Sequence, residues 1–372
     1  MMNPNEGGIF HGRAAVRVRL QRVCVLMCSA LLMACTSVPV KEFASYREAV
    51  DKARAAAEVV LTDYSAALAE QRVLMAARKP EQPKRPGAFD PMTAGGDGAN
   101  LDYVAVRYQA LAIVGKYNDA LASLAEGRSA AEVGGAVDGL VNSLSQSPLA
   151  EAKEFATALA PFLGPLKVLL AEADKEASRQ RFLAGLKAGL PLIKDDLIAL
   201  LRQDSQLMAE VRFGLNDLQY GHALDRVDDA RRRFDALSSH YAATEEVRQM
   251  QAEIAAALAK LPRDSTGKAA PLRSPAKSGS QEAVTAAVLA ELESQRTQTL
   301  NEIAGAMRIN DALVAYYGVL GAYVKLLNKM AGSTGQLFQA AETGQKFVLP
   351  SDELLKAVIA LRQSYMTYTE KK

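Results

Sequence analysis

Three side chains on one predicted helical face have the residue types of a divalent metal site. His222, Asp225 and Asp229 are spaced i, i+3 and i+7, so an α-helix places them on the same side. The same segment holds four arginines, and Asp228 with Arg232 forms the first of two consecutive i,i+4 charge pairs. Neither His-x3-His nor HExxH occurs in the chain. We therefore favour a solvated, ion-paired face and predict no metal and no cofactor.

Motifs for a catalytic nucleophile are weaker still. Ser274 and Lys277 have a Ser-x-x-Lys spacing, but they fall in a predicted loop rather than at a helix start. Thr266-Gly267-Lys268 lacks the earlier glycine of a phosphate-binding loop, and Gly-x-Ser-x-Gly is absent. Adjacent acid pairs point apart on a helix. We predict no catalytic residue, no enzyme and no small-molecule substrate.

Cys35 is the remaining residue with reactive chemistry. It follows Leu32-Met33-Ala34 and an apolar run from Val23 to Met33, and arginines at positions 13, 17, 19 and 22 precede that run. A basic flank, a short apolar core and a small residue before the cleavage point are typical of a secretory signal. The 11-residue core is too short to span a bilayer comfortably.

A cysteine directly after such a cut resembles the lipobox of bacterial lipoproteins, although Met33 replaces the usual alanine or serine. The resemblance implies that residues 1–34 are a removed signal peptide and that the Cys35 thiol is diacylated. Residues 35–41 would then tether the protein to a membrane through the acyl chains. Thr36 is not the aspartate associated with inner-membrane retention, so the resemblance favours the outer membrane, facing the periplasm.

Removal of the signal peptide also changes the charge balance. It takes four arginines and one glutamate from the 44 basic and 42 acidic residues, and leaves 40 and 41. A nearly neutral chain lacks the concentrated basic charge that nucleic-acid binding requires, so we predict no nucleic-acid partner. Cys24 and Cys28 leave with the signal, so no disulfide can form and stability must come from apolar burial.

Composition and periodicity indicate an all-α fold. The chain has no Trp, only 6% aromatic residues, and no convincing alternation of β-branched residues. Apolar residues step by three and four along residues 42–77, 101–125 and 191–261. The last of these segments contains no proline after Pro191, so we predict one helix, or two nearly collinear ones, about 100 Å long. The expected architecture is an elongated multi-helix bundle with long coiled-coil-like helices.

Pro- and Gly-rich stretches divide this bundle without splitting it into separate domains. Loops are predicted at 79–99 and 262–279, within a single helical domain covering 42–372. Residues 303–331 carry two apolar faces, so their helix should be central, with Gly332 and Gly335 ending it. A final helix should begin at Ser351, after Pro350.

These features favour a lipid-anchored envelope lipoprotein that acts as a non-enzymatic structural or protein-interaction scaffold with a protein partner in the envelope. The alternative depends on residues 155–190, an apolar segment broken by prolines and glycines. This segment is expected to be either a helical hairpin buried in the bundle or an element that enters lipid. In the second case the protein would be a membrane-interacting or pore-forming bundle.

Overall fold

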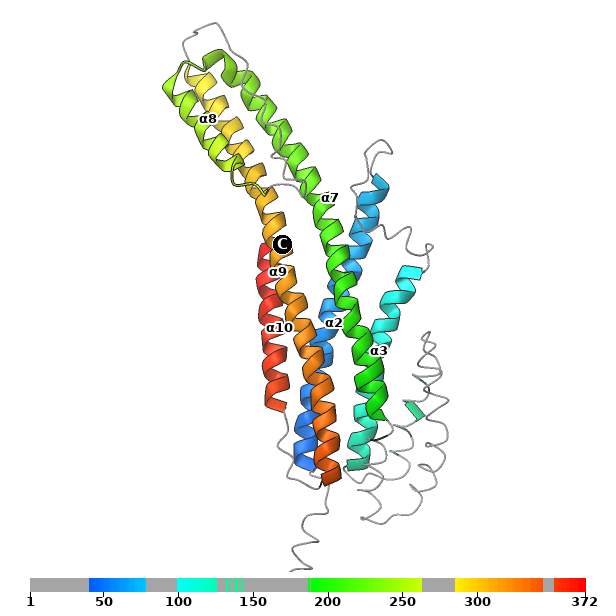
Figure 1. Ribbon diagram of the computed structural model, residues 1–372. Coiled ribbons are helices and arrows are strands. Elements are labelled where there is room, and N and C mark those ends of the chain that lie inside the picture. Colours follow the sequence, from blue (N-terminus) through cyan, green and yellow to red (C-terminus); the bar gives the residue numbers. More distant parts are fainter. Residues whose placement is uncertain are drawn as a thin grey trace, which may run out of the picture. The chain divides into compact units, whose positions relative to one another are not determined.

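The computed structural model describes residues 40–77, 99–125, 189–262, 285–343 and 351–372, together with residues 132, 135, 138, 139, 142 and 187. The described residues are almost entirely helical and contain no strand, so the all-α prediction is confirmed (Figure 1). The elements are α2 (Val40–Ala77), α3 (Ala99–Ala125), the π-helix η1 (Leu192–Leu197), α7 (Ile198–Ser238), the 3₁₀ helix η2 (Ser239–Tyr241), α8 (Glu245–Leu258), α9 (Ala286–Thr343) and α10 (Ser351–Lys371).

Helix ends fall where the sequence supplies a stop or a start. α2 ends at Ala77, three residues before Pro80, and α3 ends at Ala125, shortly before a glycine. α10 begins at Ser351 directly after a proline, and two acids in its first turn complement the helix dipole. The predicted ends of α2 and α3 and the start of α10 are therefore confirmed.

The prediction of one helix or two collinear helices over 191–261 is wrong. After a π-helical turn, α7 ends at Ser238, the chain turns through Ser239–Thr244, and α8 packs back beside α7 and α9 (Figure 1). Thr244 is extended, with φ −77° and ψ 135°, and the first turn of α8 starts with Glu245 and Glu246. An extended threonine before two acids is a helix start, so these residues break the helix without any proline or glycine.

The apolar periodicity continues across this turn because α7 and α8 both pack their apolar residues, together with those of α9, into one core. Nine buried residues form this core: Ala223, Val227, Phe234, Val247, Met250, Ile254, Leu292, Ile303 and Ala306. Leu237 and Tyr241, next to the turn, pack against the same cluster. Periodicity reports which residues face the core, and here it could not distinguish a straight helix from a helical hairpin.

The central helix is longer than predicted. α9 contains 58 residues and runs through Gly332 and Gly335 to Thr343. Each glycine costs about 1 kcal/mol inside a helix, but packing around this segment offsets that cost. Thr334 is buried, donates to the carbonyl of Met330, and shares a 3.0 Å hydrogen bond with the Tyr46 hydroxyl.

Both apolar faces predicted on α9 are largely buried, which confirms that this helix packs between neighbours. The buried members are Ile303, Leu313, Leu320 and Leu327 on one face and Tyr316, Val319, Tyr323, Leu326 and Met330 on the other. Tyr317, predicted on the first face, is instead 46% exposed.

The chain forms two compact units, each assembled from three segments. Unit 1 contains the described residues within 1–51, 109–198 and 330–354, and unit 2 contains those within 52–108, 199–329 and 355–372. In unit 1, the Phe43 and Tyr46 rings contact each other at an angle of 43°, and Arg47 pairs with Asp119. Gly189 lies so close to the Tyr117 ring that a Cβ at this position would stand 2.0 Å from Cε2, which accounts for the glycine.

Several predicted segments lie outside the described residues. They are the signal peptide with Cys35, the proline-rich loop at 79–99 apart from its last residue, nearly all of the loop at 262–279, and the apolar segment 155–190 apart from Lys187, Gly189 and Leu190. In the part of the chain that is described, none of the helices has the length and apolar character needed to cross a membrane.

Gly305→Ala should raise the free energy of unfolding by about 0.5–1 kcal/mol. Gly305 lies inside α9, and a Cβ added there would have no atom within 4 Å, so the gain in helix propensity meets no steric cost. Urea unfolding followed by circular dichroism measures the change. A loss of stability would mean that this position is packed more tightly than the structure indicates.

Candidate functional site

A buried ion pair lies inside unit 2. Asp63 on α2 accepts a hydrogen bond from Nη2 of Arg212 on α7, and the two residues are 6% and 5% exposed. Two further groups contact this carboxylate: the Tyr368 hydroxyl of α10 and the Nζ of Lys372, the residue after α10, each donate to Oδ1 over 3.4 Å. The Asp63 cluster, as we name Asp63, Arg212, Tyr316, Tyr368 and Lys372, thus joins four helices.

The Arg212 guanidinium also lies against two aromatic rings. Its Cζ lies 4.8 Å from the ring centroid of Tyr316 and 5.1 Å from that of Tyr368, while the two rings meet edge to face at 5.3 Å. A cation over an aromatic face is stabilised by the ring quadrupole, more strongly when water is excluded. The guanidinium is therefore held by two adjacent rings that lie on the same side of it and by the Asp63 carboxylate.

Burial and charge set the protonation of this cluster. Burial alone lowers the pKa of Arg212, but the Asp63 carboxylate and the neighbouring tyrosines together raise it above its ordinary value. Burial raises the pKa of both Tyr316 and Tyr368 well above 10, against the opposing effect of Arg212. At neutral pH both hydroxyls are thus protonated, and neither can serve as a general base.

A second buried pair repeats this arrangement between α3 and α7. Arg107 binds Asp204 through two hydrogen bonds, Nε to Oδ2 at 2.6 Å and Nη2 to Oδ1 at 2.8 Å. Burial, with Asp204 nearby, raises the pKa of Tyr64. Bidentate geometry fixes the direction of both side chains, so this pair positions α3 on α7.

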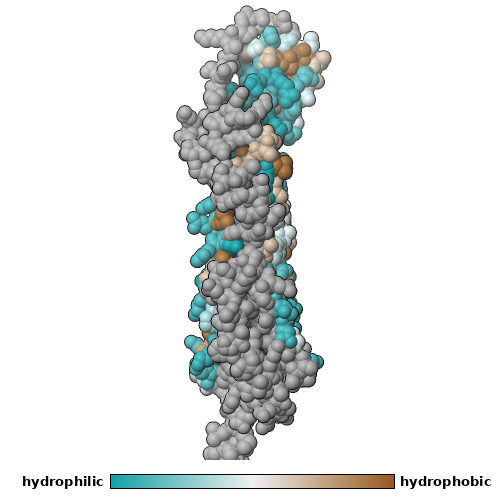
Figure 2. All heavy atoms as spheres, turned by 90° about the vertical axis from the view of Figure 1, so that its right-hand side faces the viewer, coloured by the Kyte–Doolittle hydropathy of each residue, from teal (hydrophilic) through white to brown (hydrophobic). Residues whose placement is uncertain are grey.

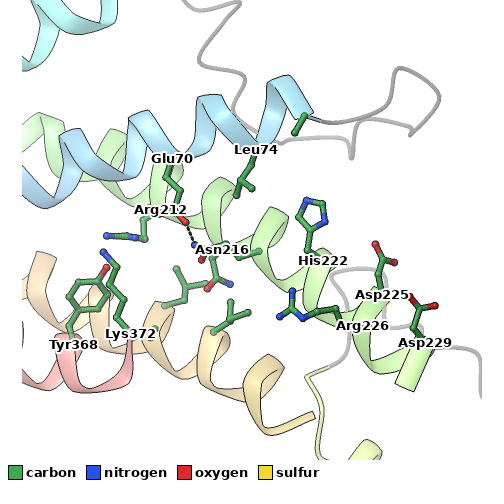
Figure 3. A pocket seen from close by; sticks show the side chains of 15 residues that line it. Glu70, Leu74, Arg212, Asn216, His222, Asp225, Arg226, Asp229, Tyr368 and Lys372 are labelled. Atoms are coloured by element: carbon green, nitrogen blue, oxygen red, sulfur yellow. Dashed lines mark hydrogen bonds between the residues drawn. The ribbon is translucent and has the colours of Figure 1, made fainter. Parts of the chain in front are cut away.

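An open pocket of about 770 Å³ adjoins the Asp63 cluster (Figure 3). Arg212, Tyr368 and Lys372 stand at one end, while Asp225 and Asp229 stand at the other. Apolar side chains of α2 and α9 contribute to the wall between these ends. Glu70 lies near Arg212 and Arg226 lies near Asp225, so both ends of the pocket carry acidic and basic groups.

Most charges around this pocket already have partners in the protein. Arg226 pairs with Glu302 of α9 at 3.0 Å, and the Gln219 amide donates to Glu70 at 2.5 Å. Arg212 and Lys372 share Asp63. A ligand would have to compete with these contacts, so the arrangement favours holding the helices together over binding a charged small molecule.

The three residues considered for a metal site all line this pocket but do not converge. His222, Asp225 and Asp229 are exposed on α7, and no group of three His, Cys, Asp or Glu within the described residues is arranged around a possible metal position. The predicted ion-paired face is present, although with different partners: Asp229 pairs with Arg232, and Arg231 pairs with Asp235 at 3.3 Å.

The other candidates from the sequence cannot be placed. Cys35, the Ser274 and Lys277 pair and the Thr266–Lys268 segment all lie outside the described residues. Neither buried ion pair was predicted from the sequence, because a single Asp or Arg between apolar positions resembles an ordinary surface residue. The one available signal was position: Arg212 follows Val211 directly and lies three residues before Leu215, both of which are buried on α7.

Comparison with known proteins gives no relative: no family model, no curated protein and no solved structure matches the chain.

Proposed function

We propose that this protein is a lipid-anchored envelope lipoprotein whose helical bundle acts as a non-enzymatic structural or protein-interaction scaffold. The observation that carries the proposal is the Leu32-Met33-Ala34-Cys35 sequence, placed after a basic flank and a short apolar run. In this proposal diacylated Cys35 anchors the mature chain, on the outer membrane and facing the periplasm, and the helices present surfaces to a protein partner.

The chemistry of the described residues supports a non-enzymatic role. An active site keeps an acid, base or nucleophile poised for a substrate, often with its pKa moved toward neutrality. In the described residues the strongest shifts belong to buried tyrosines whose pKa moves away from neutrality. The buried Asp63 and Asp204 are each engaged by an arginine. These groups stabilise a bundle rather than prepare a reaction.

Cys35→Ser should move the protein from the membrane fraction to the soluble envelope fraction. Diacylation supplies two acyl chains, enough for stable anchoring, and serine cannot receive them through a thioether. Fractionation of cells expressing the full-length gene measures the change, and mass spectrometry of the native N-terminal peptide identifies the acyl groups directly. Cys28→Ser, inside the predicted signal, is the matched control and should remain anchored.

Two results would contradict the proposal. One is a native N-terminal peptide that still contains residues before Cys35. The other is a cleaved peptide whose Cys35 thiol is free, because the anchor would then be missing.

A further inference from the structure

One side of α9 exposes large apolar side chains and glycines in a continuous stripe. Val314 is 63% exposed and Tyr317 is 46% exposed, and Gly318 and Gly321 follow on the same side of the helix. We name these four residues the α9 stripe. Elsewhere, on the face shown in Figure 2, hydrophilic residues predominate in the described part and hydrophobic ones form small, separate groups.

The glycines make this stripe accessible to another helix. A Cβ added at Gly318 or Gly321 would have no atom within 4 Å, so none of the described residues occupies the space above these glycines. Neither glycine is needed for packing inside the protein, and each costs about 1 kcal/mol of helix stability. Small residues on a helix face allow a second backbone to approach closely, and the exposed Val314 and Tyr317 would then be buried.

Two charges flank the α9 stripe symmetrically. Asp311 lies seven residues before Gly318, and Lys325 lies seven residues after it. Both side chains are exposed, and neither has a hydrogen-bond or ion-pair partner among the described residues. Since both lie on the side of the helix that carries the stripe, they would border any contact made there.

We propose that the α9 stripe is a dimer interface, in which a second copy of this chain packs its own stripe antiparallel against the first, about a two-fold axis at Gly318. In this arrangement Asp311 of each copy faces Lys325 of the other. The two-fold axis repeats this contact, so the interface contains two ion pairs. Each Tyr317 ring packs over the glycines of the opposite helix.

The positions of Asp311 and Lys325 favour a second copy of the chain as the partner and an antiparallel direction for the helix pair. In a parallel pair Asp311 would face Asp311 and Lys325 would face Lys325, which is repulsive at both ends. A lipid surface could bury the apolar residues, but it would not supply oppositely charged partners matched to Asp311 and Lys325 on either side of Gly318. Only an antiparallel second copy satisfies both charges and fills the space above the glycines. The proposal does not depend on the lipid anchor.

Charge exchange tests the proposal. Asp311→Lys and Lys325→Asp each convert two attractive contacts into two repulsive ones, so each should raise the dimer dissociation constant about tenfold. The double variant Asp311→Lys with Lys325→Asp restores both pairs and should recover the wild-type constant. Sedimentation of the purified full-length gene product over a range of concentrations measures the constants. A monomer at every concentration, or a double variant weaker than either single one, would overturn the proposal.

A disulfide trap tests the position of the axis. Gly318→Cys places two thiols at the axis, where their Cα atoms can reach the roughly 4–7 Å that a disulfide requires, and oxidant should give a covalent dimer in intact cells. Ser294→Cys, exposed on the same helix but 24 residues away, is the matched control. Its two thiols would lie about 72 Å apart and should not cross-link. Equal cross-linking of both variants, or of neither, would refute the two-fold arrangement.

Discussion

Asp63→Ala should lower the free energy of unfolding by about 3–5 kcal/mol. The substitution leaves the Arg212 guanidinium buried with its charge but without its carboxylate partner, and it also removes the acceptor of the Tyr368 and Lys372 contacts. The aromatic rings around Arg212 cannot replace an ion pair. Urea or guanidinium unfolding, followed by helical circular dichroism, measures the loss.

Asp119→Ala is the matched control, because it breaks an ion pair of the same chemistry at a half-exposed site. Arg47 and Asp119 are 2.6 Å apart, with side chains 34% and 38% exposed. Water and salt screen such a pair, and its loss should cost less than about 1 kcal/mol. Equal effects of the two substitutions would mean that the Asp63 cluster is solvated.

A double replacement separates the cost of an orphaned charge from the value of the pair. Asp63→Leu together with Arg212→Met removes both charges and fills the space with apolar atoms, so it should destabilise less than Asp63→Ala alone. If the double variant is the less stable of the two, the cluster contributes net stability through its hydrogen bonds and ring contacts. The single-variant prediction holds in either case.

Fold class and several helix ends could be predicted because they depend on local chemistry. Prolines from Pro80 onward end α2, and Ser351 after a proline starts α10, whatever the rest of the chain does. The two apolar faces of α9 indicated a helix between neighbours, and most of their residues are buried. Each of these conclusions needed only residues within a few turns of one another.

The turn after Ser238 and the full length of α9 depend on contacts between distant residues. α9 continues through two glycines where Thr334 hydrogen-bonds with Tyr46, a residue 288 positions away in sequence. The Asp63 cluster is a stronger case, because its carboxylate and guanidinium are 149 residues apart. A single sequence shows periodicity along each helix but not which helices face one another, so these partners could not be paired.

High pH should unfold the protein cooperatively, because buried tyrosines resist ionisation in the fold. Burial raises the pKa of Tyr46 to about 12, and its hydrogen bond with Thr334 acts in the opposite direction. Burial also raises the pKa of four further tyrosines, Tyr64, Tyr117, Tyr316 and Tyr368. Unfolded tyrosine ionises near 10, so each group's contribution is complete below pH 10 and is lost as pH rises through the folded pKa.

Tyr46 alone should contribute a loss of about 3 kcal/mol between pH 10 and pH 12, and the other four add to it. We therefore expect tyrosinate absorbance from these residues to appear together with the loss of helical circular dichroism. Tyr46→Phe provides the internal test. At pH 7 it should cost about 1 kcal/mol through the lost hydrogen bond to Thr334, whereas near pH 12 the variant should be the more stable protein because phenylalanine cannot ionise. If tyrosinate absorbance develops fully while the helices stay intact, these hydroxyls reach solvent in the folded protein and the buried tyrosine contacts described for both units are wrong.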